Sequence, residues 1–416
     1  MSDARRIAYD LLRAVDERDA YANLLLPTLV KGLDQRDRAF AAELGYGTLR
    51  ALGTLDHVIG LVSSRPVEAI DPPVRDLLRL GTYQLLRTRV PPHAAVGTTV
   101  DLAKRVAGQG AAKFVNAVLR KVASRDGDLG LPADPLDRLA IETAHPRWIV
   151  DAFVAVLGEE EAGDALRADD LRPEVHLVAR PGRITQEELA AQSGGTPGTL
   201  SPYAVRLTSG GDPGDVPAVR EGRAGVQDEG SQYAALALTE LVPEGRVLDL
   251  CAGPGGKAAL VAATLTGGDL LANELHEHRA RLVRDTLRDA HGVPYAVVTG
   301  DGRRGPWRPG TFDAVLLDAP CTGLGALRRR PEARWRRGPG DVAPLNALQR
   351  ELLAAAVDAV KPGGTVLYVV CSPHLAETRD VVATAKGVER LGETQLWPHR
   401  EGTDAMFLAR LRRIVT

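Results

Sequence analysis

Hydrophobic positions follow a helical period through the first third of the chain. Apolar side chains recur every three or four residues at Ile7, Ala8, Leu11, Leu12 and Val15, and again at Phe114, Val115, Val118, Leu119 and Val122. Asp71-Pro72-Pro73 is a typical helix start, and Pro91-Pro92 breaks the pattern before it resumes over residues 96–106. Because no strand-like alternation interrupts residues 4–123, the pattern predicts an all-α domain over residues 1–128.

In the middle of the chain the helical pattern gives way to a mixture of strand-like and helical segments. A stretch rich in Gly, Asp and Pro at residues 126–132 indicates a linker. Beyond it, residues 174–179 and 203–207 have the character of strands, and residues 186–192 that of a helix. Residues 129–225 are therefore predicted to form a small α+β subdomain that links two larger domains.

Short apolar runs alternate with helical segments in the last part of the chain. Five such runs lie at residues 247–250, 270–273, 296–298, 314–317 and 365–370. This alternation is typical of a parallel α/β sheet. Residues 226–416 are therefore predicted to form a Rossmann-like α/β domain, in which ligands bind outside the carboxyl ends of the strands.

Composition narrows the class of protein without indicating a function. The chain has 416 residues, a formal charge of −2 and 44% hydrophobic residues, which is ordinary for a soluble protein of two or three domains. No apolar run approaches the roughly 20 residues that cross a membrane, and the first residues lack the apolar core of a signal peptide. The three cysteines form no C-x-x-C pair and the nine histidines no ligand pattern, which disfavours a disulfide framework and a metal site. Free thiols favour a reducing cytoplasm.

A glycine-rich turn follows the first apolar run of the C-terminal domain. The chain continues there as Cys251-Ala252-Gly253-Pro254-Gly255-Gly256-Lys257, where glycines let a ligand approach the backbone. Glu274 lies 21 residues after Gly253, where nucleotide-binding folds place an acceptor for ribose hydroxyls. Asp301 follows the third run and could accept a hydrogen bond from an adenine amino group. The turn lacks the G-x-G-x-x-G pattern, so a nucleotide-like cofactor other than NAD is predicted.

Two cysteines carry the candidate reactive chemistry. Cys321 lies in Asp318-Ala319-Pro320-Cys321-Thr322-Gly323 and Cys371 in Val370-Cys371-Ser372-Pro373, 50 residues apart, each after an apolar run. One free cysteine is usually a small buried hydrophobe, and Cys251 is expected to be of that kind. Two thiols at the same sheet edge as a cofactor turn favour covalent catalysis instead. The residues leave open which thiol attacks, because both sit at strand ends.

Basic residues concentrate in two places. Residues 1–125 hold 19 lysines and arginines against 13 acidic residues, which suggests an anionic partner. Residues 328–337, shortly after Cys321, contain six arginines and one glutamate. We expect RNA contacts here rather than a merely solvated loop, because arginine binds phosphates and tryptophan stacks on unpaired bases. The expected RNA-binding residues are Arg328, Arg329, Arg330, Arg334, Trp335 and Arg336.

These motifs together resemble those of a known family. The glycine turn, the Cys321 motif and Cys371-Ser372 with Glu377 look like the corresponding segments of the RNA 5-methylcytosine methyltransferases that use S-adenosylmethionine. Residues 226–232 are similar to the stretch before the catalytic core in that family, and residues 114–121 resemble the transcription antitermination factor NusB. The resemblance implies a NusB-like RNA-binding domain joined to a methyltransferase of the bacterial kind that modifies 16S ribosomal RNA.

The resemblance also implies roles for individual residues. Cys371 would be the nucleophile that adds to C6 of a cytosine, and Cys321 would assist breakdown of the adduct and product release. Asp318 would lie near the methionine end of the cofactor and the cytosine, where it could stabilise the adduct. The cofactor would lie on residues 251–257 with Glu274, Asp301 and Asp318 around it.

Several expectations about partners follow. Ribosomal RNA is the expected substrate, with no metal and no membrane, and the protein is expected to be a monomer. The same chemistry on tRNA or another RNA is the nearest alternative, and a non-catalytic RNA-binding assembly or antitermination factor is an alternative of a different class. DNA is the least favoured substrate, because nothing in the chain resembles a DNA target-recognition region. Whether the helical domain binds RNA or a protein stays open.

Overall fold

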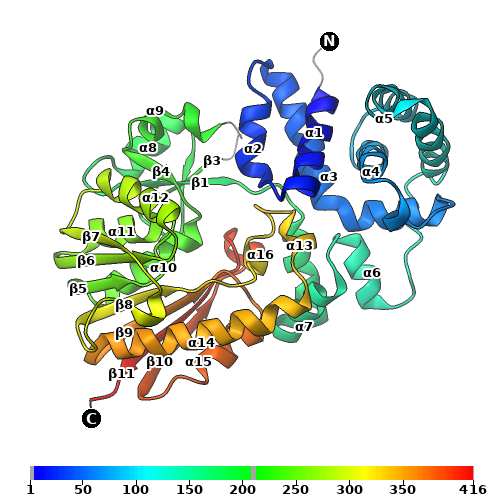
Figure 1. Ribbon diagram of the computed structural model, residues 1–416. Coiled ribbons are helices and arrows are strands. Elements are labelled where there is room, and N and C mark those ends of the chain that lie inside the picture. The colour runs from blue at the N-terminus through cyan, green and yellow to red at the C-terminus, as the bar shows by residue number, and fades with distance from the viewer. Residues whose placement is uncertain (1–3, 208–211, 416) are drawn as a thin grey trace. The chain divides into compact units, whose positions relative to one another are not determined.

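The chain folds into two compact units, which Figure 1 shows as a ribbon. The computed structural model describes residues 4–207 and 212–415. The helical unit comprises Met1–Arg172 and Leu327–Arg337, and the sheet unit comprises Pro173–Ala326 and Gly338–Thr416.

The unit boundaries differ from the predicted domain boundaries. The sequence predicts divisions near residues 128 and 225, whereas the chain passes from the helical unit to the sheet unit at Arg172. The region between the two predicted divisions is therefore shared: residues up to Arg172 join the helical unit, and residues from Pro173 join the sheet unit. A later segment, Leu327–Arg337, returns to the helical unit.

The helical unit is all-α in its described residues, as the periodicity predicts. Its helices are α1 (Ala4–Arg18), α2 (Ala22–Leu29), α3 (Gln35–Val62), α4 (Pro72–Arg87), α5 (Pro92–Ala123), α6 (Pro135–Glu142), α7 (Arg147–Asp169) and α13 (Ala333–Arg336), with a 3-10 turn η1 (Val67–Ala69). Asp34 caps α3 by accepting from the Asp37 backbone N–H at 2.8 Å. Gly108 has φ 84° and breaks α5 between the two predicted apolar stretches.

A small antiparallel sheet opens the sheet unit. Its strands are β1 (Val175–Ala179), β2 (Thr196–Pro197), β3 (Ala204–Leu207) and β4 (Ala224–Val226), in the order β2-β3-β1-β4, and its helices are α8 (Gln186–Ser193) and α9 (Pro217–Arg220), with a 3-10 turn η2 (Pro213–Asp215). The capping box of Thr185 and Glu188 starts α8, and Gly194 ends it in a left-handed conformation. These elements confirm the predicted α+β character of this region.

A seven-stranded sheet forms the centre of the sheet unit. Its strands are β5 (Glu244–Asp249), β6 (Gly267–Glu274), β7 (Tyr295–Thr299), β8 (Phe312–Asp318), β9 (Val360–Val370), β10 (Val388–Gln395) and β11 (Phe407–Arg413), in the order β10-β11-β9-β8-β5-β6-β7. Strands β5 to β9 run parallel, while β11 is antiparallel to β9 and β10 is antiparallel to β11. The predicted parallel α/β sheet is therefore confirmed, with two antiparallel strands added at one edge.

Helices cover both faces of this sheet, which is why its strands are apolar on successive residues. Val247 packs on one face and Leu248 on the other, and the same alternation holds along β8 and β9. The helices of the unit are α10 (Glu229–Leu241), α11 (Gly256–Thr264), α12 (Glu277–Arg288), α14 (Val342–Ala359), α15 (Arg379–Val382) and α16 (Pro398–Glu401), with 3-10 turns η3 (Gly302–Arg304), η4 (Leu324–Ala326), η5 (Pro339–Asp341) and η6 (Leu375–Glu377). Residues of α10, α11 and α12 pack on one face, and residues of α14 and α15 on the other.

Candidate active site

Two thiols meet where strands β8 and β9 end. These strands are parallel neighbours, and Asp318 is paired with Val369 in their ladder. Cys321 and Cys371 therefore leave the sheet at the same edge, and their Sγ atoms lie 3.4 Å apart. The structure thus brings together the two cysteines that the sequence places 50 residues apart.

Glycines shape the turn between β5 and α11. A Cβ on Gly253 would lie 2.1 Å from Glu274 Oε2, and Gly255 has φ 109°, a conformation that favours glycine. Glu274 accepts from the backbone N–H of Gly253 at 3.2 Å and of His276 at 3.0 Å. The predicted acid and the predicted turn are therefore in contact. A carboxylate has further lone pairs, so Glu274 can still accept a hydrogen bond from a ligand hydroxyl.

Lys257 joins the glycine turn to the thiol site. Its Nζ lies 2.7 Å from Asp318 Oδ2 in a partly buried ion pair. Burial alone would lower the pKa of Lys257, but the negative charge of Asp318 and its hydrogen bond with Lys257 outweigh burial, and the pKa is raised. Lys257 is therefore a cation at neutral pH.

Asp249, at the end of β5, is a buried acid that the sequence analysis did not single out. It is 1% exposed, and among the described residues no side chain donates a hydrogen bond to its oxygens. Burial raises the pKa of Asp249 to about 7, and the nearby carboxylate of Asp318 adds to the shift. An acid that directly ends an apolar strand before a glycine turn was the available signal, but the sequence does not show burial.

The raised pKa of Asp249 predicts a pH-dependent stability. Between about pH 4 and 7 the folded state keeps this proton while the unfolded state loses it, so the folded state loses stability as the pH rises. Asp249→Asn removes the titration. We expect the stability of the variant relative to the parent to increase by roughly 3 kcal/mol between pH 5 and pH 8. Urea unfolding at the two pH values measures this change.

Asp313→Asn provides the control for this prediction. Hydrogen bonds from Lys361 and from the Arg246 backbone outweigh burial and lower the pKa of Asp313, so this group is ionised in both states from pH 5 to 8. The stability difference between Asp313→Asn and the parent should therefore be flat over that range. A flat difference for Asp249→Asn as well would contradict the prediction.

Asp301 is engaged in an ion-pair network where β7 ends. Its carboxylate accepts from Arg303 Nε at 3.0 Å and from Nη2 at 2.7 Å, and these hydrogen bonds lower its pKa. Arg303 also contacts Glu351 at 2.7 Å. The structure places Asp301 at the expected strand end, and its role as an adenine acceptor stays a prediction.

The arginine-rich segment belongs to the helical unit, where it forms α13. Arg334 has no exposed surface, and its guanidinium donates to the backbone oxygens of Asp169 at 2.7 Å and Arg50 at 3.0 Å. Because a fully buried guanidinium is not accessible to a phosphate, the prediction that Arg334 binds RNA is contradicted. Arg334 anchors its segment among the helices instead.

The other members of the segment differ in exposure. Arg336 donates to the backbone oxygens of Val15 and Ala20 at 3.1 and 2.7 Å. Trp335 is 39% exposed, and its ring lies on α3 at Gly53, where a Cβ would be 2.5 Å from the ring. Arg328 is buried, Arg329 half-buried and Arg330 exposed. RNA contacts therefore stay a prediction for the accessible members, Arg330 and Trp335 foremost.

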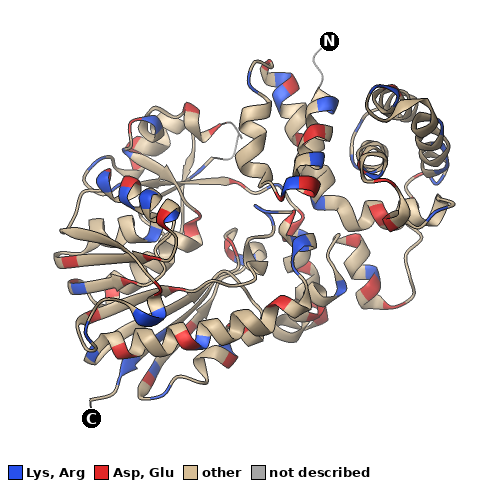
Figure 2. Cartoon of the chain, viewed as in Figure 1, with Lys and Arg blue, Asp and Glu red and all other residues tan. Residues whose placement is uncertain are grey.

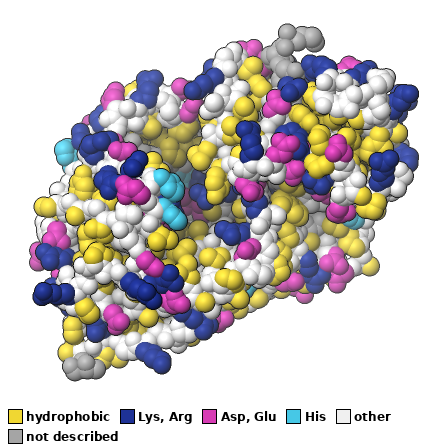
Figure 3. Space-filling model, viewed as in Figure 1, with side chains coloured by type: hydrophobic (Ala, Val, Ile, Leu, Met, Phe, Trp, Pro, Cys, Tyr) yellow, Lys and Arg dark blue, Asp and Glu magenta, His cyan; other side chains and the backbone are white. Residues whose placement is uncertain are grey.

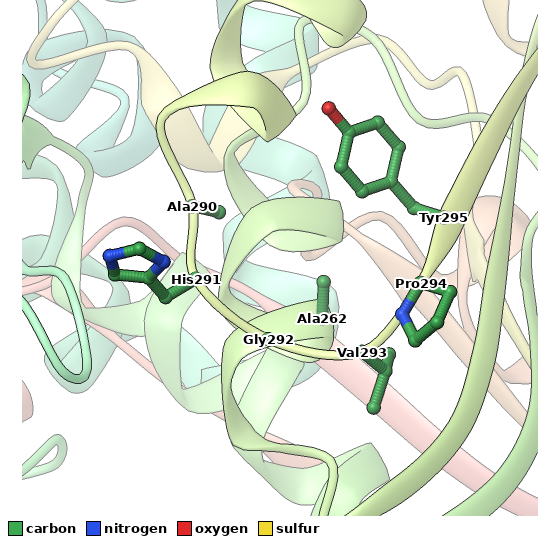
Figure 4. A pocket seen from close by; sticks show the side chains of 7 residues that line it. All are labelled: Ala262, Ala290, His291, Gly292, Val293, Pro294 and Tyr295. Atoms are coloured by element: carbon green, nitrogen blue, oxygen red, sulfur yellow. The ribbon is translucent and has the colours of Figure 1, made fainter.

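A separate hollow lies at the end of the parallel strands opposite to the thiols. Figure 4 shows the side chains that line it. The hollow has a volume of about 420 Å³ and is lined by Ala262, Ala290, His291, Gly292, Val293, Pro294 and Tyr295. Tyr295 begins β7, whereas the thiols lie where the strands end. None of the predicted site residues lines this hollow, so it is not part of the candidate site.

Charge is distributed over the whole molecule. Figure 2 shows basic and acidic residues interspersed along both units, and Figure 3 shows them interspersed on the face that it draws. Within the described residues, no three His, Cys, Asp or Glu side chains gather as a metal site would require. No described helix has both the length and the apolar character of a membrane span.

The fold and the site define the class of the protein. A mostly parallel sheet with a glycine turn, acidic strand ends and two neighbouring thiols at one edge is typical of an α/β enzyme of the methyltransferase class. The family model described as 16S rRNA methyltransferase RsmB/F matches residues 235–412, and the model of the NusB family matches residues 2–124. The chain therefore belongs to the RsmB/F methyltransferase family and carries an N-terminal domain of the NusB family.

Individual relatives match along their whole length. The chain is 54% identical to a Mycobacterium tuberculosis protein named "Putative methyltransferase Rv1407", covering 100% of this chain and 97% of that protein. It is 33% identical to ribosomal RNA small subunit methyltransferase B of Pseudomonas putida, covering 99% and 98%. The crystal structure of PH0851 has the same fold, with a TM-score of 0.85, 22% identity and 99% of each chain covered.

Proposed function

We propose that this protein transfers a methyl group from S-adenosylmethionine to C5 of a cytosine in 16S ribosomal RNA. The observation that carries the proposal is the pair of thiols, 3.4 Å apart, at the same sheet edge as a glycine turn and a partly buried lysine. Cytosine C5 is a poor nucleophile, and a thiolate that adds to C6 makes C5 reactive. Loss of the C5 proton after methylation then expels the thiolate.

The residues at the sheet edge fit S-adenosylmethionine. Its ribose hydroxyls and its ammonium group are hydrogen-bond donors, and the edge offers the carboxylates of Glu274 and Asp318. The turn leaves room for close approach, because Gly253 and Gly255 carry no Cβ. When it is bound there, S-adenosylmethionine supplies a methyl group activated by a positively charged sulfur.

The surroundings of the two thiols support Cys371 as the nucleophile. A hydrogen bond with Cys371, together with burial, raises the pKa of Cys321 well above its ordinary value. Cys321 therefore keeps its proton and can donate its S–H to Cys371. The ammonium of Lys257 is paired with Asp318 at 2.7 Å, at the end of β8, from which the chain continues to Cys321. Cys321 is then in place to assist breakdown of the adduct and product release.

Ribosomal RNA is the proposed substrate because of the relatives of this chain. The Pseudomonas putida relative is named a ribosomal RNA small subunit methyltransferase, and the N-terminal domain belongs to the NusB family. The net positive charge of residues 1–125 agrees with an anionic partner. A purely RNA-binding role is less consistent with a retained thiol pair and cofactor turn.

The test is methylation of unmodified, deproteinised 16S rRNA with labelled S-adenosylmethionine. We expect 5-methylcytosine at one position, mapped to a single nucleotide, and none with Cys371→Ala. Unmodified tRNA and partly assembled small-subunit particles are assayed in parallel. Methylation of tRNA alone would replace the proposed substrate, and no methylation of any of the three would favour a non-catalytic RNA-binding role.

A further inference from the structure

A buried carboxylate lies behind the two thiols. Glu377, at the end of η6, has no exposed surface. Its Oε1 accepts from the Thr322 backbone N–H at 2.7 Å, and its Oε2 accepts from Ser372 Oγ at 2.6 Å and from the Thr322 hydroxyl. Thr322 and Ser372 directly follow Cys321 and Cys371. One side chain therefore holds both cysteine loops.

Other elements fix the position of this carboxylate. Gln349 on α14 donates to Glu377 Oε1 at 3.2 Å and to the Pro320 backbone oxygen at 2.9 Å. Tyr368 on β9 donates its hydroxyl to the Glu377 backbone oxygen at 2.7 Å. Gln349 and Tyr368 are themselves fully buried. The carboxylate is thus tied to both the sheet and the helix that covers it.

The partners of Glu377 are neutral. Its described hydrogen-bond donors are one backbone N–H, two hydroxyls and one amide, with no lysine, arginine or histidine among them. A buried carboxylate is costly without donors, and here four hydrogen bonds offset that cost. The network therefore holds together only when both cysteine loops present their donors to the same carboxylate.

The loops beyond the sheet depend on such contacts. The ladder between β8 and β9 ends at Asp318 and Val369, before either cysteine. Past that point the links between the loops include the Glu377 network and a backbone hydrogen bond from Gly325 to Cys371 at 2.9 Å. The Thr322 and Ser372 hydroxyls also lie 3.4 Å apart, so Glu377 holds together the two residues that directly follow the cysteines.

We propose that Glu377 is a positioning residue that keeps the two thiols within reach of one another. Its consequence for catalysis rests on the proposed function: Cys321 must stay beside Cys371 while the adduct forms and breaks down. A displacement of about 1 Å in such a site costs on the order of 10²-fold in rate. Thiol proximity itself can be measured without RNA or cofactor.

Phenylarsine oxide is the probe of thiol proximity. Two thiols replace its oxygen and form two S–As bonds with release of one water, and no oxidant is needed. The parent protein should bind one equivalent of phenylarsine oxide tightly through both thiols. Cys321→Ala, which keeps only Cys371 of the pair, gives the reference affinity for binding through one thiol. Titration followed by intact-protein mass spectrometry measures the apparent Kd of each variant. A parent that binds no more tightly than Cys321→Ala would overturn the proposal.

Glu377→Leu should weaken arsenical binding about tenfold or more, because it leaves the four donors unpaired and frees the loops. Glu377→Gln should stay close to the parent, since the Thr322 and Ser372 hydroxyls can rotate to accept from its amide. Ser372→Ala, which loses one hydrogen bond and should fold, is expected to show a smaller loss in the same direction. Parent-like binding by both Glu377→Leu and Ser372→Ala would contradict the proposal. If Glu377→Leu does not fold, Ser372→Ala decides alone.

Glu229→Leu is the matched control. Glu229 is also fully buried and accepts hydrogen bonds from two backbone N–H groups and from Arg206. None of these donor residues is next to a cysteine in the chain. Glu229→Leu should lower the free energy of unfolding at least as much as Glu377→Leu does. It should nevertheless bind phenylarsine oxide with the same apparent Kd as the parent. If it weakens binding as much as Glu377→Leu, the effect is general loss of stability and the proposal fails.

A second measurement links the proposal to catalysis. With RNA and S-adenosylmethionine, Glu377→Leu should accumulate a covalent enzyme–RNA adduct relative to released product, whereas mere loss of folded protein lowers both in proportion. Absence of methylation by the parent would refute the proposed function and leave the arsenical result standing. Normal methylation by the parent with unchanged arsenical binding in the variants would refute the positioning role alone.

Discussion

Replacing Cys371 with alanine is expected to abolish methyl transfer, with a loss of roughly 10⁴-fold or more, since no other group takes over a nucleophile's role. The same variant should form no covalent complex with RNA. Replacing Cys321 should leave the attack intact and slow the breakdown, so that Cys321→Ala accumulates an enzyme–RNA adduct. The adduct is measured as a labelled band that survives on a denaturing gel.

Cys251 provides the control for the adduct experiment. It is the third free thiol of the chain, and burial raises its pKa, which makes it unreactive. Cys251→Ala should therefore trap no adduct. An adduct with Cys371→Ala and none with Cys321→Ala would reverse the assigned roles of the two thiols.

Replacing Arg334 should have the largest effect on stability. Its guanidinium is fully buried, donates to several backbone oxygens and lies 3.4 Å from Asp170 Oδ1. Arg334→Met keeps the length of the side chain but leaves these acceptors unpaired. We expect the helical unit to lose about 3–5 kcal/mol of unfolding free energy. Urea unfolding followed by far-ultraviolet circular dichroism measures the loss.

Arg330→Met is the matched control within the same segment. Arg330 is exposed and packs over the ring of Tyr21 at 5.6 Å, a contact worth about 1 kcal/mol or less. A similar loss in the two variants would show that burial of Arg334 does not set its contribution. Arg330→Met should instead weaken RNA binding more than it weakens folding, if the exposed arginines bind phosphates.

Much of the fold could be predicted because its signals are local. The 3.6-residue period of α1 and the apolar run that became β9 depend only on neighbouring residues, and both elements formed where they were expected. Parallel strands end at one edge, so the sequence also predicted that Cys321 and Cys371 would meet. The separation of 3.4 Å between their Sγ atoms agrees with that inference.

Burial and pairing between distant segments could not be predicted in the same way. Arg334 lies in a run of arginines, and such a run predicts an exposed segment. In the structure Arg334 is fully buried among helices from the first 172 residues. Asp249 and Glu377 are acids whose importance comes from the absence of water around them and from donors on other elements. The order of residues thus determined the elements and the sheet edge that carries the chemistry. The raised pKa of Asp249, the hydrogen bonds of Glu377 to both cysteine loops and the enclosure of Arg334 were decided by tertiary packing, because only packing sets solvation and long-range hydrogen bonds.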